Sequence, residues 1–256
     1  MLGLGLGANK IGLRGGLQAI INKYGFHNYW DFDKSTVIGS TTTLLDYKGV
    51  HNLSNPAAAN QPTLNSPDSD FNNKNSGTFV NSDPDYLYKA VANYQGSDTS
   101  GVFTAIIKTP SAWSGVAEGL ISITDDTEAD TCISLHLNNG NLDIFYDEGA
   151  TTNIFRATTP IALNTLYIIS GYSNGSTYKS CINETIDTGG MFSGSNDGTW
   201  FSALGNTNSI NFGVLNRSGA MRYYNSKIKG VGYMPFVSDA EVQALHSELN
   251  KIVKIY

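Results

Sequence analysis

Residues 131–148 read Thr-Cys-Ile-Ser-Leu-His-Leu-Asn-Asn-Gly-Asn-Leu-Asp-Ile-Phe-Tyr-Asp-Glu, and this stretch decides the fold. The Asn139-Gly140 pair at its centre is typical of a two-residue type I′ turn, because both central residues of that turn need a positive φ. A turn at this point predicts that residues 131–138 pair in antiparallel fashion with residues 141–148.

The turn also fixes which side chains face each other. On one face of the predicted hairpin every opposed pair is apolar: Leu137 with Leu142, Leu135 with Ile144, and Ile133 with Tyr146. On the other face His136 lies opposite Asp143, and Ser134 lies opposite Phe145. Because a slip of one residue would place apolar groups on both faces, pattern and turn together predict an antiparallel sheet with one side in a core.

The rest of the chain extends this pattern. Strand-like segments recur at short intervals from residue 78 to residue 233, with no helical pattern between them. The chain has 256 residues, only 15% of them charged, and 27 glycines, which is typical of a turn-rich β protein. We therefore expect an all-β fold, an antiparallel jelly-roll sandwich that forms one domain over residues 26–256.

Composition and charge exclude several classes of partner. The net charge of −6 and the absence of a Lys/Arg stripe argue against nucleic acid, and no apolar run approaches the ~20 residues of a membrane span. Cys132 and Cys181 lie inside predicted strands and are expected to be free core thiols. The start at Met1 lacks the basic segment of a signal peptide, so we expect a protein that is not secreted and stays in the cell that makes it, or enters a particle there.

Residues 1–25 differ from the rest, with seven glycines and only a short helical pattern from Leu17 to Lys23. Ordering this segment costs roughly 25–50 kcal/mol, which so few side chains can hardly offset alone. Either the segment packs along its own sandwich, or it is an assembly arm that lies on a neighbouring subunit. The apolar residues of the expected arm are Leu2, Leu4, Leu6, Ile11, Leu13, Leu17, Ile20 and Ile21.

Two further segments have distinct patterns. Residues 54–77 are polar and proline-containing, which predicts a lid-like loop or a surface wrap. Near the C-terminus, Ser238 and Glu241 form a capping box, which predicts a short α-helix that starts here. Its apolar stripe is expected to face the sandwich: Val242, Leu245, Leu249, Ile252 and Tyr256.

None of the catalytic motifs that the sequence contains in part has the surrounding sequence that its chemistry requires. Gly171-Tyr-Ser173-Asn-Gly175 matches the nucleophile-elbow pattern, but that pattern needs a helix after the serine, and here Asn174-Gly175 reads as a hairpin turn before another strand. The four histidines have no metal-site spacing, and the run of carboxylates that a retaining glucanase needs is missing. We expect no catalytic residue and no enzymatic activity.

Two groups of side chains are candidates for binding. Asp125, Asp126, Glu128 and Asp130 crowd one loop, where solvation is favoured and a bound calcium ion is the alternative; no other cofactor is expected. Four aromatic residues offer flat faces to a sugar, although core packing explains them equally well: Trp113, Trp200, Tyr223 and Tyr224.

Three stretches resemble one family. Residues 29–33, Tyr-Trp-Asp-Phe-Asp, followed by Asp-Tyr-Lys-Gly-Val-His-Asn-Leu at 46–53, look like the opening of concanavalin A-like, laminin-G-like jelly rolls. The hairpin over residues 164–183 is similar to the family's central hairpin, and residues 224–245 resemble its closing strand and helix. The Gly-rich start before such a domain further resembles virion proteins of tailed bacteriophages.

The resemblance implies a function. It suggests a non-enzymatic structural subunit of a virion, in a fibre, tail or head decoration, that is made in the host cytoplasm and assembles through its N-terminal arm with other virion subunits or as a homo-oligomer. The alternative is a glycan-binding adhesion module that contacts carbohydrate on a host surface.

Overall fold

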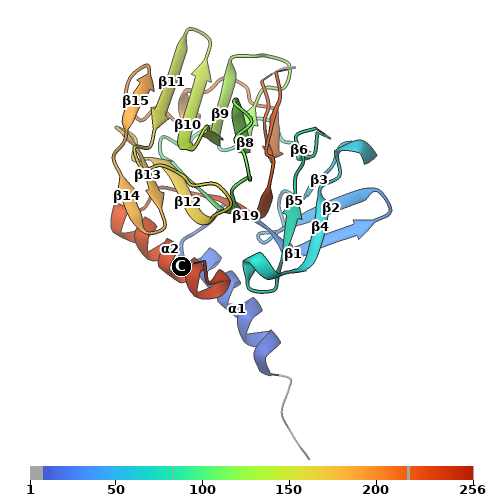
Figure 1. Cartoon of the computed structure of the whole chain (residues 1–256). Coiled ribbons are helices and arrows are strands. Elements are labelled where there is room, and N and C mark those ends of the chain that lie inside the picture. Colours follow the sequence, from blue (N-terminus) through green and yellow to red (C-terminus); the bar gives the residue numbers. More distant parts are fainter. Residues whose placement is uncertain (1–7, 83, 218–219, 256) are drawn as a thin grey trace, which may run out of the picture.

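The computed structural model describes residues 8–82, 84–217 and 220–255, with side chains from residue 16 onward (Figure 1). The chain folds into an antiparallel β sandwich with helices on one side, as the sequence predicts. In the part of the chain that is described, neither helix is long and apolar enough to cross a bilayer.

One layer of the sandwich carries the helices. Its strands are β1 (Asn28–Ile38), β2 (Thr41–Asp46), β4 (Thr63–Asp68), β5 (Lys74–Thr78), β7 (Gly101–Lys108), β12 (Leu166–Ser173), β13 (Tyr178–Ile182), β14 (Thr185–Asp187) and β19 (Lys227–Met234). Short β3 (Leu53–Ser54) pairs with β2 and with a strand of the opposite layer, so the two layers join there.

The opposite layer contains the predicted hairpin. In order of pairing its strands are β6 (Leu87–Ala90), β16 (Ser209–Phe212), β8 (Ala117–Thr124), β9 (Thr131–Asn138), β10 (Asn141–Glu148), β11 (Thr151–Arg156) and β15 (Gly190–Ser193). A separate pair, β17 (Val214–Leu215) and β18 (Arg222–Tyr223), lies on this layer. The described residues also contain three 3₁₀ turns: η1 (Ala58–Asn60), η2 (Ser69–Phe71) and η3 (Phe201–Ala203).

The β9–β10 hairpin has the predicted register. Leu142 pairs with Leu137 and Asp143 pairs with His136, and the turn residues Asn139 and Gly140 have φ values of 48° and 82°. The apolar face is buried against the other layer, where a Cβ on Gly171 of β12 would touch the side chains of Leu135 and Ile144. The main core therefore lies between the layers, as expected.

Helix α2 (Asp239–Val253) begins at the predicted cap. The Ser238 hydroxyl accepts a hydrogen bond from the Glu241 amide at 3.3 Å and donates one to the Glu241 carboxylate at 2.7 Å. Val242, Leu245 and Leu249 are buried against the sandwich, as the stripe predicts. Tyr256 lies outside the described residues.

Helix α1 (Ala8–Lys23) is longer than the predicted helical segment, and it corrects the expected arm. Leu17, Ile20 and Ile21 are buried in the chain's own second core, which helix α2 and the outer face of β7 and β12 complete. These three side chains are not available to a neighbouring subunit, so the assembly prediction is wrong for them. The side chains of Ile11 and Leu13, and residues Leu2, Leu4 and Leu6, lie outside the described part.

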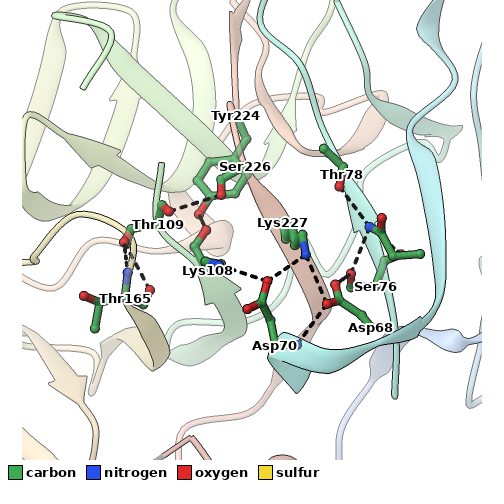
Figure 2. A network of polar contacts seen from close by, with 11 residues as sticks. Asp68, Asp70, Ser76, Thr78, Lys108, Thr109, Thr165, Tyr224, Ser226 and Lys227 are labelled. Atoms are coloured by element: carbon green, nitrogen blue, oxygen red, sulfur yellow. Dashed lines mark hydrogen bonds and ion pairs between the residues drawn. The ribbon is translucent and has the colours of Figure 1, made fainter. Parts of the chain in front are cut away.

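The polar stretch 54–77 is not a loose lid. It contains the β4–β5 hairpin, which two lysines on neighbouring strands hold in place (Figure 2). The Lys227 ammonium donates to Asp68 at 3.0 Å and to Asp70 at 2.7 Å, and Lys108 donates to Asp70 at 2.9 Å. The stretch therefore extends the helix-bearing layer, because β5 pairs with β19 and β4 pairs with β5, and it is neither the lid-like loop nor the surface wrap that the sequence predicts.

Candidate functional site

The outer face of the β6–β16–β8–β9–β10–β11–β15 layer carries the β17–β18 pair. This pair crosses directly above β8, where the Ser122 hydroxyl donates to the carbonyl of Val214 at 3.0 Å. A Cβ on Gly119 would lie 1.8 Å from the backbone nitrogen of Leu215, so only glycine permits this close approach. The pair is thereby fixed as a ridge on the sheet.

The ridge separates two grooves. In the ridge, Val214 pairs with Tyr223 and Leu215 pairs with Arg222. Because successive side chains of a strand point to opposite faces, these two pairs lie on different faces of the ridge. The Leu215 and Arg222 side borders one groove, over β9, β10, β11 and β15; we call it the arginine groove. Asn216 borders the other groove, over β6 and β16, which we call the tyrosine groove.

The arginine groove has a volume of about 180 Å³. Its lining residues are Ala117, His136, Asn138, Asp143, Phe145, Ile154, Arg156, Phe192, Leu215, Arg217, Ala220 and Arg222. This volume is below the ~300–1,000 Å³ of pockets for drug-sized ligands, so the groove suits one compact unit of a larger ligand.

Two of the arginines are held by carboxylates. Arg156 donates to both oxygens of Asp143, from Nε at 2.8 Å and from Nη2 at 2.6 Å. Burial raises the pKa of Asp143, but the hydrogen bonds from Arg156 and His136 outweigh that effect and hold this pKa below its usual value. Arg217 donates from Nη2 to Oδ2 of buried Asp147, while its Nε donates to the carbonyl of Ala129.

The third arginine and an aromatic ring face solvent. Among the residues that the structure describes, no carboxylate pairs with exposed Arg222, whose Nη1 lies 3.5 Å from the carbonyl of Met221. Phe192 on β15 is 62% exposed, and the guanidinium carbon of Arg156 lies 4.0 Å from the centre of its ring. The groove therefore combines an apolar wall with an uncompensated positive charge.

The tyrosine groove has a volume of about 270 Å³ and a different lining: Pro56, Tyr86, Tyr88, Asp126, Asn211, Asn216 and Met221. The Tyr86 ring packs on Tyr223, with 6.0 Å between the ring centres. No lysine or arginine is among these lining residues.

The four aromatic residues predicted as sugar contacts lie in different parts of the structure. Trp200 and Tyr224 are buried in the core, where the Trp200 indole donates to the Tyr233 hydroxyl. The Tyr224 hydroxyl donates to the carbonyl of Lys108 (Figure 2). The ligand prediction is therefore wrong for these two. Half-buried Trp113 packs against the main core and lines neither groove, whereas Tyr223 supports the tyrosine groove.

The carboxylates of the acidic loop, residues 125–130, do not converge on one point. The Asp125 carboxylate accepts hydrogen bonds from the amide and hydroxyl of Thr127 and from the side chain of Asn208, while Glu128 and Asp130 are exposed. Across the described chain, no three carboxylate, histidine or cysteine side chains form a group that could hold a metal ion. Calcium binding by the acidic loop stays a prediction.

Ser173 has a structural role in the β12–β13 hairpin. Its hydroxyl is fully buried, donates to the carbonyl of Gly198 and accepts a hydrogen bond from the Gly175 amide. Strand β13 follows the turn, so the strand–turn–helix context of a nucleophile elbow is missing, as predicted. The thiols of Cys132 and Cys181 are also buried and free, as predicted.

Sequence reasoning missed the residues that line the grooves. Extending the predicted register to the next strand would have placed Arg156 opposite Asp143, because those two residues pair between β10 and β11. In the same way, alternation along residues 86–90 leaves Tyr86 and Tyr88 on one face. No comparable signal exists for Arg222 or Phe192, which reach the arginine groove only through non-local packing.

No protein-family model and no curated protein matches the chain. Its fold is similar to solved structures. A CBM40 module of a Ruminococcus gnavus IT-sialidase bound to α2,3-sialyllactose has a TM-score of 0.50 at 15% identity, with 57% of this chain and 82% of that chain covered. A leech intramolecular trans-sialidase gives 0.52 at 12%, with 68% and 27% covered, and a Trypanosoma rangeli sialidase gives 0.55 at 11%, with 89% and 33% covered. At these identities the likeness shows the all-β sandwich.

Proposed function

We propose that this chain is a non-catalytic carbohydrate-binding domain that holds an acidic sugar in the arginine groove. The observation that carries the proposal is Arg222, an exposed cation without a carboxylate partner among the described residues, which lines the same groove as the exposed ring of Phe192. Aromatic faces and a few charged groups are how proteins orient small polar ligands.

The charge balance of the groove supports an anionic ligand. Asp143 and Asp147 compensate Arg156 and Arg217, which leaves Arg222 in excess on a chain whose net charge is −6. A guanidinium presents two parallel N–H groups that match both oxygens of a carboxylate. A carboxylated sugar ring therefore offers both elements that the groove can recognise, namely a charge for Arg222 and an apolar ring face for Phe192.

One of the structures with a similar fold also supports a carbohydrate-binding role. The Ruminococcus gnavus CBM40 module, described with bound sialyllactose, has a similar sandwich. Because a shared fold does not determine function, the proposal rests on the groove itself.

The test is the substitution Arg222→Gln. We expect N-acetylneuraminic acid and α2,3-sialyllactose to bind the wild type, and the variant to lose ~10- to 100-fold in affinity, since a hydrogen bond to a charged group contributes about 1.5–3 kcal/mol. Isothermal titration calorimetry provides the measurement. Lys251→Gln is the matched control, because it removes the same charge from the exposed side of α2 and should leave the affinity unchanged.

Two results would contradict the proposal. If Arg222→Gln binds the acidic sugars as tightly as the wild type, the groove is not the site. If incubation of the protein with α2,3-sialyllactose releases lactose, the domain is catalytic.

The predicted virion role is compatible with this site. Helices α1 and α2 cover the outer face of the layer that contains β7 and β12 (Figure 1). The grooves lie on the outer face of the other layer. A subunit that attached to a particle through residues before α1 would keep the grooves on its other side. Assembly with other virion subunits, or as a homo-oligomer, stays a prediction.

A further inference from the structure

We infer that the tyrosine groove is a second sugar site, separate from the arginine groove and selective for an uncharged, hydroxyl-rich sugar unit. This inference extends the proposed function to a different surface with different chemistry. Its evidence is the lining of the groove, the fixed position of its amides and the ridge that divides the two grooves.

The lining matches a ligand with many hydroxyl groups. The side chains of Tyr86, Tyr88, Asn216 and Asp126 supply phenol, amide and carboxylate groups around one hollow. Phenols and amides both donate and accept hydrogen bonds, and an ionised carboxylate accepts them from sugar hydroxyls. Asp126 is the only charged residue among the described residues that line the groove, so the groove disfavours a ligand carboxylate.

The amides are held in position before any ligand arrives. The amide nitrogen of fully buried Asn211 donates to the hydroxyls of Thr124 at 3.2 Å and Ser209 at 3.0 Å. Asn216 is only 7% exposed; its backbone amide donates to the Ser122 hydroxyl at 3.2 Å, and its side-chain nitrogen donates to Oδ1 of Asn211 at 3.5 Å. Polar groups that are fixed in this way lose little conformational entropy on binding.

The tyrosines are also fixed, and they remain hydrogen-bond donors. Tyr86 is half-buried against Tyr223, and burial raises the pKa of Tyr86 above its usual value. Burial and the nearby Asp126 carboxylate raise the pKa of Tyr88 as well. Both rings therefore offer protonated hydroxyls throughout the neutral pH range, next to flat apolar surface on which a sugar ring can lie.

The two grooves lie on opposite sides of the ridge, where Asn216 lines the tyrosine groove and its chain neighbour Arg217 lines the arginine groove. Strand β16 lies under the tyrosine groove and β10 lies under the arginine groove, with β8 and β9 between them in the sheet. At the usual spacing of paired strands, β16 and β10 are about 15 Å apart. The ridge stands between them over β8. The structure therefore assigns separate ligands, or separate units of one branched glycan, to the two grooves.

The experiment uses separate probes for each groove. Lactose, cellobiose and N,N′-diacetylchitobiose are the neutral probes, N-acetylneuraminic acid is the acidic one, and saturation-transfer NMR titrations of the full chain report the affinities. We expect at least one neutral disaccharide to bind, and Tyr88→Ala to weaken it at least tenfold while the affinity for N-acetylneuraminic acid changes less than twofold.

Two further variants guard against loss of the fold. Tyr88→Phe keeps the ring and removes only the hydroxyl, and we expect it to weaken neutral binding by about threefold to tenfold. Lys89→Ala alters the exposed neighbour on the same strand and should change neither affinity. Thermal unfolding of each variant checks that the domain remains intact.

The outcomes separate this inference from the proposed function. Binding of a neutral sugar that depends on Tyr88, without any binding of the acidic probe, would support the second site and overturn the proposal for the arginine groove. The inference is overturned if no neutral probe binds, if Tyr88→Ala leaves neutral binding intact, or if it weakens both kinds of probe equally.

Discussion

Three arginines line one groove, yet their partners give them different roles. Removing Arg156 would leave the buried Asp143 carboxylate without its bidentate partner, and breaking a buried ion pair in this way costs about 3–5 kcal/mol. Arg222 is exposed and has no such partner among the described residues. A substitution at Arg222 therefore reports on binding, whereas one at Arg156 mixes binding with stability.

His246 makes stability depend on pH. Its side chain is fully buried in α2, with Nε2 2.8 Å from the Ser170 hydroxyl, and burial lowers its pKa to about 3. In the unfolded chain the pKa of histidine is ~6.5, so below that pH the unfolded state binds a proton that the folded state does not. The folded state is therefore increasingly disfavoured as the pH falls from ~6.5 towards 3.

We expect this group alone to remove about 2 kcal/mol from the free energy of unfolding between pH 7 and pH 5. His246→Leu has no proton to gain, so its stability should fall less over that interval, whatever its stability at pH 7. Urea unfolding of both proteins at each pH measures the two slopes. Equal slopes would show that His246 is protonated in the folded state.

Helix α1 is weakened by its glycines, and one of them can be replaced. A Cβ on Gly16 would lie 3.8 Å from Cδ1 of Ile252, which is an ordinary contact with α2. We expect Gly16→Ala to raise the free energy of unfolding by about 0.5–1 kcal/mol, because alanine is the better helix former and restricts the unfolded chain.

Gly77→Ala is the contrasting control for this prediction. Its Cβ would lie 2.2 Å from Cζ of Phe32, so the same chemical change should destabilise the protein. Chemical denaturation of both variants compares them. A destabilised Gly16→Ala variant would mean that the two helices are packed more closely than the contact distance indicates.

Elements defined by local chemistry were predictable from sequence. The β9–β10 hairpin needs only an Asn-Gly turn and alternating residues, and α2 needs only its cap and stripe, so both match the structure. The length of α1 was not predictable in this way. Its glycines give little local preference for a helix, and packing against α2 stabilises it instead.

The grooves depend on contacts between distant parts of the chain. The ridge is placed by Gly119 beneath Leu215, and these residues are far apart in sequence. Aromatic residues were equally ambiguous, since Trp200 is buried in the core while Phe192 is exposed, and neither has a distinguishing local pattern. Sequence therefore predicts the sandwich, and only the folded chain shows which side chains share a surface.

The N-terminal segment is joined to the domain by its second core. The sequence predicts that a chain starting at Tyr24 still folds, because the hairpins and the capped helix remain. In the structure that truncation removes Leu17, Ile20 and Ile21, which are buried against α2 and the sheet. Burying one aliphatic side chain contributes about 1.5–3 kcal/mol, and a truncated chain would expose their apolar partners to water.

We therefore expect the chain that starts at Tyr24 to unfold at lower denaturant concentration than the full chain, because it exposes the apolar partners of Leu17, Ile20 and Ile21 on α2 and the sheet to water. A chain that starts at Ala8 is the control, since it keeps every contact described for α1. Sedimentation of the same proteins tests assembly. Residues before α1 act in assembly if the full chain forms an oligomer and the chain that starts at Ala8 folds normally but does not join it. If the chain that starts at Tyr24 is as stable as the full chain, the second core does not need α1.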